Sequence, residues 1–360
     1  MIKLKIAITV LLLALFGVAP AQSQDDLSVK LETNPAAGQI GPDNTFVRTT
    51  LTVVDASGQA VSNAYLKLHL DSPPGNPIIS TDFPIVEDTA LMNYEGILPN
   101  GVLEFESIYP IRGQYSFEVE AGRDATALSF KDTLNLSINE NSNEVMNGVI
   151  FMASLLVLGL VAGIIIGNGA RARRMAAAGV VLLVLMAGLI SSSASVARAH
   201  SGDEVSAVEP FTESVTNGDL TLTYTMNPGA GKVGTLNTLT FEATNNNGVL
   251  VPDTTFEVKF WHIEDDKPVF ATTLYAPTGQ IQLDFQFFDG AEHEVRLVAS
   301  NAIGTVDLAK VVDVEGIDPP MPVKIKTTIY LVLVTFVGIL IGLRIQVIRG
   351  KNQELATMGV

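Results

Sequence analysis

The sequence predicts a membrane protein with two all-β domains, each an antiparallel β-sandwich, and three transmembrane α-helices. Three observations support this prediction: uncharged apolar runs of membrane-spanning length, an internal repeat, and short alternating runs of apolar and polar residues. The chain has 360 residues, which leaves room for two domains of ordinary size once the apolar runs are set aside.

The first apolar run opens the chain. Lys3 and Lys5 precede the short stretch Ile6–Val18, and Ala19-Pro20-Ala21 follows it. A basic start, a short apolar stretch and a small-x-small exit are typical of a secretory signal peptide. We therefore expect residues 1–21 to be a signal peptide cleaved after Ala21, with an uncleaved anchor helix as the alternative.

Three later apolar runs predict transmembrane helices. Basic residues follow the first and the last of them: Arg171, Arg173, Arg174, Arg344, Arg349 and Lys351. Because basic residues accumulate on the cytoplasmic side of a membrane, both clusters are placed inside. This predicts a multi-pass protein of the bacterial cell (inner) membrane, with both large domains on the extracytoplasmic, periplasmic side.

The expected segments follow from this topology. In order they are the signal peptide 1–21, a first β-sandwich 22–146, a transmembrane helix 147–167, a cytoplasmic loop 168–175, a transmembrane helix 176–196, a second β-sandwich 197–326, a transmembrane helix 327–343 and a cytoplasmic tail 344–360. We call the two sandwiches the first and the second module. One alternative is open: Arg171–Arg174, the next apolar run and Ala197-Arg198-Ala199 also resemble a signal peptide. Cleavage there would leave a domain that begins at His200.

The two modules share an internal repeat. Residues 34–46 read NPAAGQIGPDNTF, and residues 227–239 read NPGAGKVGTLNTL. The matched residues in the first module are Asn34, Pro35, Ala37, Gly38, Gly41, Asn44 and Thr45, and in the second Asn227, Pro228, Ala230, Gly231, Gly234, Asn237 and Thr238. A late strand, Gln114–Val119, likewise parallels Glu292–Leu297. Short alternating strands separated by turn residues predict an Ig-like sandwich for each copy.

The first module resembles the bacterial YtkA-like and FixH-like extracytoplasmic Ig-like modules. The residues that carry the resemblance are Pro35, Gly38, Asp55, Gly58, Gly113 and Tyr115. The second module matches less well, since Ala291 and His293 replace the last two. The resemblance implies an Ig-like fold outside the cytoplasm, and no reaction.

Composition excludes several functions. Residues 22–146 carry 18 acids and 6 bases, and residues 197–326 carry 19 acids and 8 bases. Acidic surfaces repel phosphate backbones, so we expect no nucleic-acid partner. The absence of cysteine excludes disulfides, zinc-thiolate sites, iron–sulfur clusters and cysteine nucleophiles. The common catalytic and nucleotide-binding motifs are also missing, so we expect no catalytic residues, no cofactor-binding residues and no enzyme activity.

Histidine is the one chemical signal. His200, His262 and His293 lie in the second module, whereas His69 is alone in the first. Imidazoles outside the cytoplasm suit copper or zinc, so these three are the candidate metal ligands and copper is the candidate ion. The alternative is structural: His293 fills the position of Tyr115, and His262 caps an exposed strand. Likewise, Glu264-Asp265-Asp266 either holds a hard cation or forms a turn between strands.

Glycines recur at four-residue spacing in two of the predicted helices: Gly159, Gly163, Gly167, Gly338 and Gly342. This spacing places them on one helix face, where backbones can approach closely, and predicts helix packing. The sequence thus favours a membrane-anchored extracytoplasmic binding or scaffolding protein, such as an accessory subunit of an envelope complex with protein partners. The alternative function is extracytoplasmic copper handling by the histidines of the second module.

Overall fold

The computed structural model describes residues 27–40, 46–76, 81, 83–140, 142–168 and 209–357. The predicted signal peptide, the predicted transmembrane helix at 176–196 and His200 lie outside these residues.

Seven strands build the first module. They are β1 (Ser28–Asn34), β2 (Val47–Val54), β3 (Ala64–Asp71), β4 (Ala90–Leu98), β5 (Val102–Ser107), β6 (Gly113–Gly122) and β7 (Leu128–Ile138), with a short 3₁₀ helix, η1 (Ala37–Gln39), after β1. β1, β2 and β5 form one sheet, and β7, β6, β3 and β4 form the other, with antiparallel pairing throughout. Alternate residues of β3 are buried because one face of each sheet covers the core. The result is the predicted Ig-like sandwich.

The second module repeats this plan and adds two strands. Its strands are β8 (Phe211–Asn217), β9 (Leu220–Asn227), β10 (Gly231–Lys232), β11 (Asn237–Asn245), β12 (Thr254–His262), β13 (Lys267–Ala276), β14 (Gln280–Phe285), β15 (Glu292–Ser300) and β16 (Thr305–Glu315). β9 and the strands β11–β16 correspond in order to β1–β7. β10 is a two-residue strand parallel to β16, and β8 pairs with β9 at the edge of its sheet.

The strand registers confirm that the strands of the two modules correspond, and they correct part of the residue match. Gly41, Asn44 and Thr45 of the matched segment lie outside the described residues. Asn34 faces Arg48 across β1 and β2, whereas Asn227 faces Thr238 across β9 and β11. Thr238 therefore corresponds to Arg48, and its sequence match with Thr45 was wrong. The connection between Asn34 and its partner Arg48 is longer than that between Asn227 and Thr238. The residues that look alike after the glycines therefore do not occupy corresponding positions in the two modules. The late strands do correspond, since their ladders place Tyr115 of β6 and His293 of β15 at the same position.

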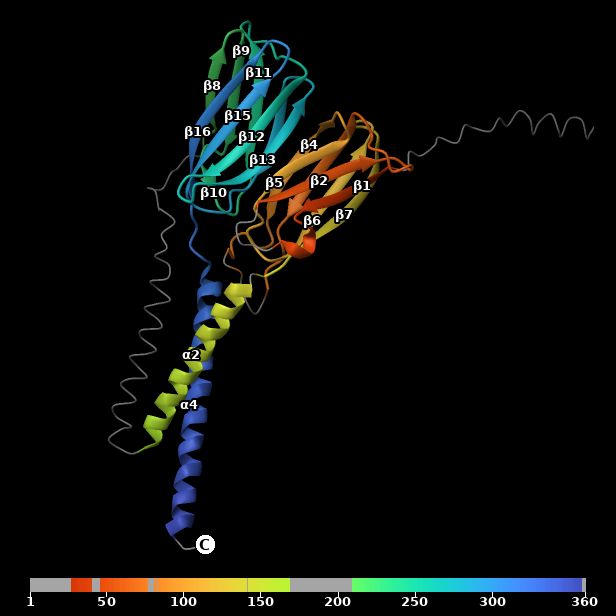
Figure 1. Ribbon diagram of the computed structural model, residues 1–360. Helices are drawn as coiled ribbons and strands as arrows, with labels where there is room; N and C mark the ends of the chain where they lie inside the picture. The colour runs from red at the N-terminus through yellow and green to blue at the C-terminus, as the bar shows by residue number, and fades with distance from the viewer. Residues whose placement is uncertain are drawn as a thin grey trace, which may run out of the picture.

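The two modules join edge to edge, which the sequence did not predict. β5 pairs with β13, and β4 pairs with β14. Both sheets therefore run uninterrupted through the molecule (Figure 1). We call β1-β2-β5-β13-β12-β15-β16-β10 sheet 1, and β7-β6-β3-β4-β14-β11-β9-β8 sheet 2.

The junction has pseudo-two-fold symmetry. β4 corresponds to β13 and β5 to β14, so each half of the junction pairs the same two kinds of strand. Phe270 faces Ser107 in one half, and Met92 faces Phe285 at the corresponding place in the other. The two halves each contain three such residue pairs in the same register. An isologous contact of this kind is typical of two copies of one fold.

One hydrophobic core extends through both modules. At the junction, the ring of Phe270 lies 6.1 Å from that of Phe105 in the first module and 5.3 Å from that of Phe260 in the second. The Phe285 ring lies 4.8 Å from both Phe270 and Phe260. Aromatic pairs at these spacings stabilise the contact beyond the area they bury. The two modules therefore form a single packed body.

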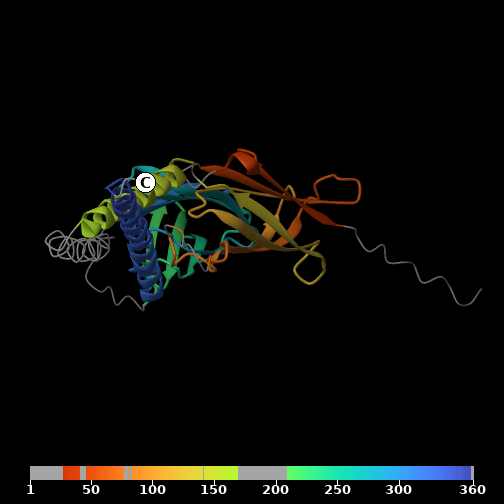
Figure 2. The ribbon, with the colours of Figure 1, turned by 90° about the horizontal axis from the view of Figure 1, so that it is seen from below.

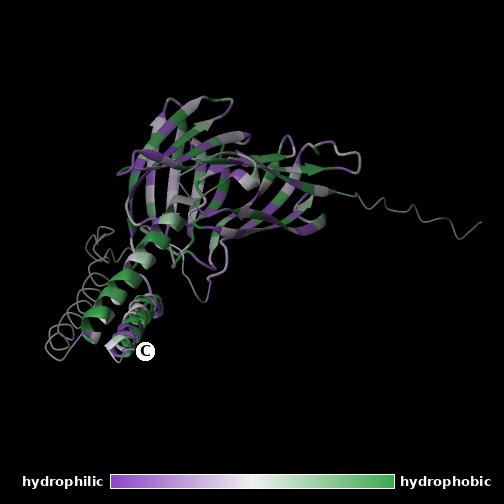
Figure 3. Ribbon diagram, turned by 60° about the horizontal axis from the view of Figure 1, so that its bottom comes forward, coloured by the Kyte–Doolittle hydropathy of each residue, from purple (hydrophilic) through white to green (hydrophobic). Residues whose placement is uncertain are grey.

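Two long helices leave this body at the same end (Figure 1). They are α2 (Ser142–Gly167) and α4 (Met321–Thr357). Among the described residues, these two are long and apolar enough to cross a membrane. The largely green, apolar α2 stands out against the alternating colours of the strands (Figure 3). Seen from below, the first module extends sideways beyond both helices (Figure 2).

α4 is longer than the sequence predicted. We expected the helix to coincide with the apolar run 327–343. It begins instead at Met321 and continues through most of the predicted tail to Thr357. The tail is rich in Arg, Lys, Gln and Glu, which are good helix formers, so the helix continues after the apolar residues end. At 37 residues it measures about 55 Å, well beyond the hydrocarbon thickness of a bilayer.

Candidate functional site

His262 and His293 lie side by side in the second module. His262 ends β12, His293 is the second residue of β15, and the two face each other across the ladder. Their ring centroids are 5.0 Å apart with the rings nearly perpendicular. Both are enclosed, at 3% and 1% exposure. The expectation that His262 caps an exposed strand was therefore wrong.

His293 makes the contacts of a structural residue. Its Nδ1 donates to the carbonyl oxygen of Ala291 at 3.0 Å. Burial lowers the pKa of His293 to about 4, so the ring is neutral at pH 7. At the corresponding place in the first module, the Tyr115 hydroxyl donates to the carbonyl of Ile111 at 2.7 Å and accepts from its N–H at 3.0 Å. Tyr115 thus makes the tyrosine corner known from Ig-like folds, and His293 takes its place in the second module.

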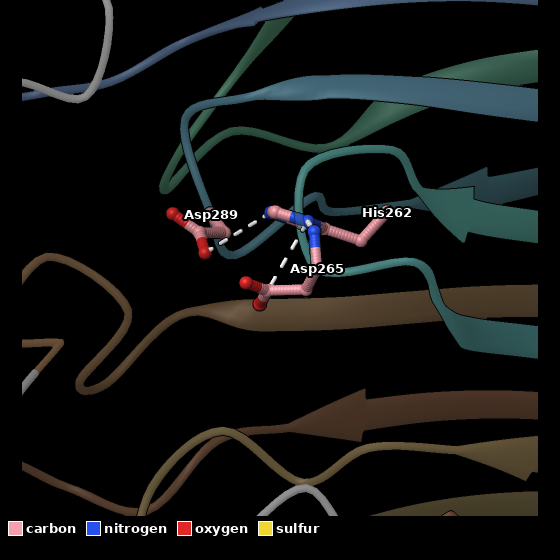
Figure 4. Close-up of side chains that lie close together, drawn as sticks. All are labelled: His262, Asp265 and Asp289. Carbon is pink, nitrogen blue, oxygen red and sulfur yellow. Dashed lines mark hydrogen bonds and ion pairs between the residues drawn. The ribbon is translucent and has the colours of Figure 1, made fainter.

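His262 lies between two carboxylates (Figure 4). Its Nε2 is 3.3 Å from Oδ2 of Asp289, in the loop between β14 and β15, and makes no well-directed hydrogen bond. Its Nδ1 accepts the backbone N–H of Asp265 at 3.1 Å. Asp265 in turn pairs with Lys267, and this hydrogen bond holds the pKa of the Asp265 carboxyl below its ordinary value. The segment 264–266 forms the turn between β12 and β13.

These hydrogen bonds determine what the cluster can do. Three potential ligand atoms, from His262, Asp265 and Asp289, lie within 4.8 Å of one another, as a divalent cation would require. However, the Nδ1 lone pair of His262 is taken by a backbone N–H, so in the neutral ring the proton resides on Nε2, facing Asp289. Lys267 already compensates the charge of Asp265. Nδ1 of His262 and the Asp265 carboxylate are thus already paired within the protein, while Nε2 faces Asp289 without a well-directed hydrogen bond. The existing pairing of these two groups does not favour copper.

A groove of about 970 Å³ crosses the junction on the outer face of sheet 2. β3, β4, β6 and β7 of the first module line it together with β14 and the β13–β14 turn of the second. Its floor holds a polar chain that crosses the module boundary: His69 contacts Asn93, whose side-chain amide donates to Asp284 at 3.1 Å. Neither module forms this groove alone.

Charged and phenolic groups line one wall of the groove. Tyr65 donates to Glu95, and this hydrogen bond holds the pKa of the Glu95 carboxyl below its ordinary value. Lys67 Nζ lies 3.2 Å from the same carboxylate. Burial raises the pKa of the neighbouring Asp71, which lies 2.9 Å from Nε2 of His69. The sequence carries no signal for the groove, because its residues come from six separate segments.

The spaced glycines lie where α2 and α4 pack together. A methyl group at Gly159 would lie 2.2 Å from the backbone oxygen of Thr335, and one at Gly163 would lie 2.2 Å from that of Ile339. Gly338 and Gly342 lie against α2 in the same way, and a methyl group at Gly167 would meet Gln346. Only glycine allows the two backbones to approach this closely.

Comparisons with known proteins identify no family. No family model matches the chain, and no curated protein matches it. Among solved structures, the Yersinia pseudotuberculosis adhesin InvE is similar at 10% identity and a TM-score of 0.21, over 81% of this chain and 61% of that chain. Trypsin-activated alpha-2-macroglobulin from Escherichia coli is similar at 10% identity and a TM-score of 0.25, over 82% of this chain and 17% of that chain. Invasin, described as a bacterial integrin-binding protein, is similar at 9% identity and a TM-score of 0.20, over 80% and 39%.

This chain therefore spans less than two thirds of the length of each of these proteins. The Ig-like fold stated above rests on the strand order and pairing of the two modules, and these similarities add no argument about function.

Proposed function

We propose that the chain is a membrane-anchored, extracytoplasmic binding or scaffolding protein without enzyme activity. The observation that carries this proposal is the junction: two uninterrupted sheets fix the modules as one body and create a groove that neither has alone. A rigid surface of this kind suits recognition of a protein partner, because little order must be gained on binding. The helices α2 and α4 would hold the body at the membrane.

The finer parts of the proposal come from the sequence. The signal peptide, the second of the three predicted transmembrane helices, at 176–196, and the basic clusters predict that both modules lie on the periplasmic side of a bacterial inner membrane. The resemblance to YtkA-like and FixH-like modules supports the same location. Within the envelope, the protein would act as an accessory subunit of a larger complex.

Crosslinking in intact membranes tests the binding role. A photoreactive residue at Gln282, which is exposed in the groove, should give a discrete protein adduct. The same residue at Lys259, which is exposed on β12 of sheet 1, serves as the control and should give none. Equal crosslinking at the two sites, or none at Gln282, would exclude the groove as the partner surface.

Thiol labelling tests the topology separately. Cysteines at Ser57 and Asn247, in two exposed turns of this cysteine-free chain, should react with an impermeant reagent in intact spheroplasts. A cysteine at Gly350, on the exposed far end of α4, should react only after the membrane is opened. Labelling of Gly350→Cys in intact spheroplasts would contradict the extracytoplasmic placement.

A further inference from the structure

β8 covers one edge of the second module. It pairs with β9 along its whole length and packs over β16 of the opposite sheet. Its Phe211 ring lies 6.2 Å from the ring of Tyr224 and 4.7 Å from Nζ of Lys310. Its Glu213 forms an ion pair with Lys310 at 3.2 Å. β8 therefore closes the side of the sandwich between β9 and β16.

In the described part of the chain, the corresponding edge of the first module is open. β1 corresponds to β9, and no described strand pairs with its free edge. Asn34 corresponds to Asn227, and counting back along both strands from these residues matches Leu31 with Tyr224. Tyr224 is fully buried beneath β8, whereas Leu31 is half-buried and packs against the core without such a cover. β1 thus presents unpaired backbone groups beside an apolar side chain, the combination that accepts an added strand.

Across this open edge lies β7, whose side chains differ from those at the corresponding positions of β16. The ladders of β7 and β16 place Leu134 where the second module has Lys310, and Asp132 where it has Leu308. Leu134 is half-buried and Asp132 is exposed, whereas Leu308 is buried. An occupant that runs like β8 would therefore meet an apolar wall at Leu134 and a carboxylate at Asp132.

We propose that the free edge of β1 accepts an extended segment of a partner protein, which adds to sheet 1 as β8 adds to β9. The segment carries an apolar side chain over Leu31 and Leu134. A basic side chain two to four residues later pairs with Asp132. The backbone hydrogen bonds supply affinity, and these two side chains supply specificity. The proposal deepens the proposed binding role, since it names one surface and one class of partner.

Two other occupants fit less well. With the predicted signal peptide 1–21 removed, the residues before Leu27 read Gln22-Ser23-Gln24-Asp25-Asp26, which offer two acids and no apolar side chain to an edge that already carries Asp132. A second copy paired through β1 would be related by a two-fold axis perpendicular to sheet 1. In Figure 1 the sheets face the viewer and the helices descend from the body, so this axis would turn the helices of the second copy away from the membrane. An extended segment of another protein has neither problem.

A peptide based on β8 tests the proposal. The probe is Phe-Thr-Val-Ser-Lys-Thr-Asn, the β8 sequence with Glu213→Val and Val215→Lys, carrying a fluorophore. The position of the lysine follows from how β8 lies along β16. Glu213 contacts Lys310, and Asn217 contacts Thr305, so Val215 between them lies near Leu308. Because Asp132 is the counterpart of Leu308, the lysine replaces Val215. Anisotropy with the full chain in detergent should show saturable binding. The unmodified sequence, Phe-Thr-Glu-Ser-Val-Thr-Asn, should bind at least about tenfold more weakly.

Two kinds of variant make the outcome decisive. Asp132→Lys should remove the preference for the lysine peptide, whereas Asp307→Lys, the same charge change on an exposed residue of β16, should not. Replacing residues 22–26 by the modified strand and its turn, a copy of Phe211–Asp219 with the same two changes, should fill the edge. This variant should abolish peptide binding and raise the unfolding temperature.

Equal binding of the two peptides, no binding to a folded chain, or unchanged binding by the filled variant would overturn the proposal. The peptide assay does not depend on topology or on the groove. Peptide binding can therefore fail while thiol labelling and groove crosslinking succeed, or succeed while they fail, and the two proposals are judged separately.

Discussion

At the scale of single residues, one position of the fold carries two different side chains. Tyr115 and His293 both lie near the start of a late strand, are buried and donate a hydrogen bond to a nearby backbone carbonyl. This structural interpretation of His293 was one of two that the sequence allowed, beside metal binding, and the hydrogen bonds support it. The partner of His262 was not foreseen, because Asp289 lies on a distant loop that carries no motif.

The depressed pKa of His293 makes stability depend on pH. An unfolded histidine titrates near 6.5, whereas the folded one titrates at about 4. Between these values the unfolded chain binds more protons, so this contribution is fully present above about pH 6.5 and is lost as the pH falls toward 4, by about 3 kcal/mol in total. His293→Tyr should retain the fold and flatten this part of the curve. Chemical unfolding of both proteins between pH 7 and pH 4.5 measures it, and identical slopes would refute the assignment.

At the scale of elements, the glycine spacing in the two helices points to a contact that the structure contains. A methyl group at Gly163 would stand 3.0 Å or less from the backbone of α4, and one at Gly342 would be equally close to α2. The sequence could locate this contact because four-residue spacing fixes one helix face. It could not fix the length of α4, because polar helix formers give no apolar signal beyond the membrane span.

Gly163→Leu or Gly342→Leu should therefore separate α2 from α4. A side chain forced into a filled contact costs typically about 1–3 kcal/mol, and here it would meet backbone that cannot move aside. Thermal unfolding in detergent should show a lower midpoint for either variant. Gly148→Leu and Gly350→Leu are the matched controls, since nothing lies within 4 Å of a methyl group at either position. A loss of stability in the controls as large as in the tested variants would show that the cause is not helix packing.

At the scale of the whole molecule, the sequence predicted two modules but not their fusion. The repeat and the alternating strands could be predicted from the sequence, because turn residues and a two-residue alternation of apolar and polar side chains are local features of the chain. The pairing of β4 with β14 and of β5 with β13 joins residues far apart in the chain, and nothing in the alternation of Leu103 or Leu283 shows which edge each strand will meet. The same limit hid β8 and the open edge of β1.

A single core predicts that the modules unfold together. Phe270→Ala removes a ring that contacts Phe105 of the first module and Phe260 of the second, and should cost about 3–5 kcal/mol. Because the cavity lies in the shared core, both modules should lose stability in one transition. Chemical unfolding followed at Trp261 in the second module and at a fluorophore on Ser57→Cys in the first provides the test. Two separated transitions would show that the modules are independent.

The distance between Ser57 and Asn247 tests the central claim, one rigid two-module body, most directly. These residues occupy corresponding turns, where Asp55 and Asn245 accept hydrogen bonds from the backbone N–H two residues on. Spin labels at Ser57→Cys and Asn247→Cys are unambiguous, because the chain has no other cysteine. With uninterrupted sheets, pulsed electron resonance should give one narrow distance distribution in detergent and in membranes alike. A broad or multiple distribution would show that the modules move independently, and it would contradict both the fused sheets and the groove built on them.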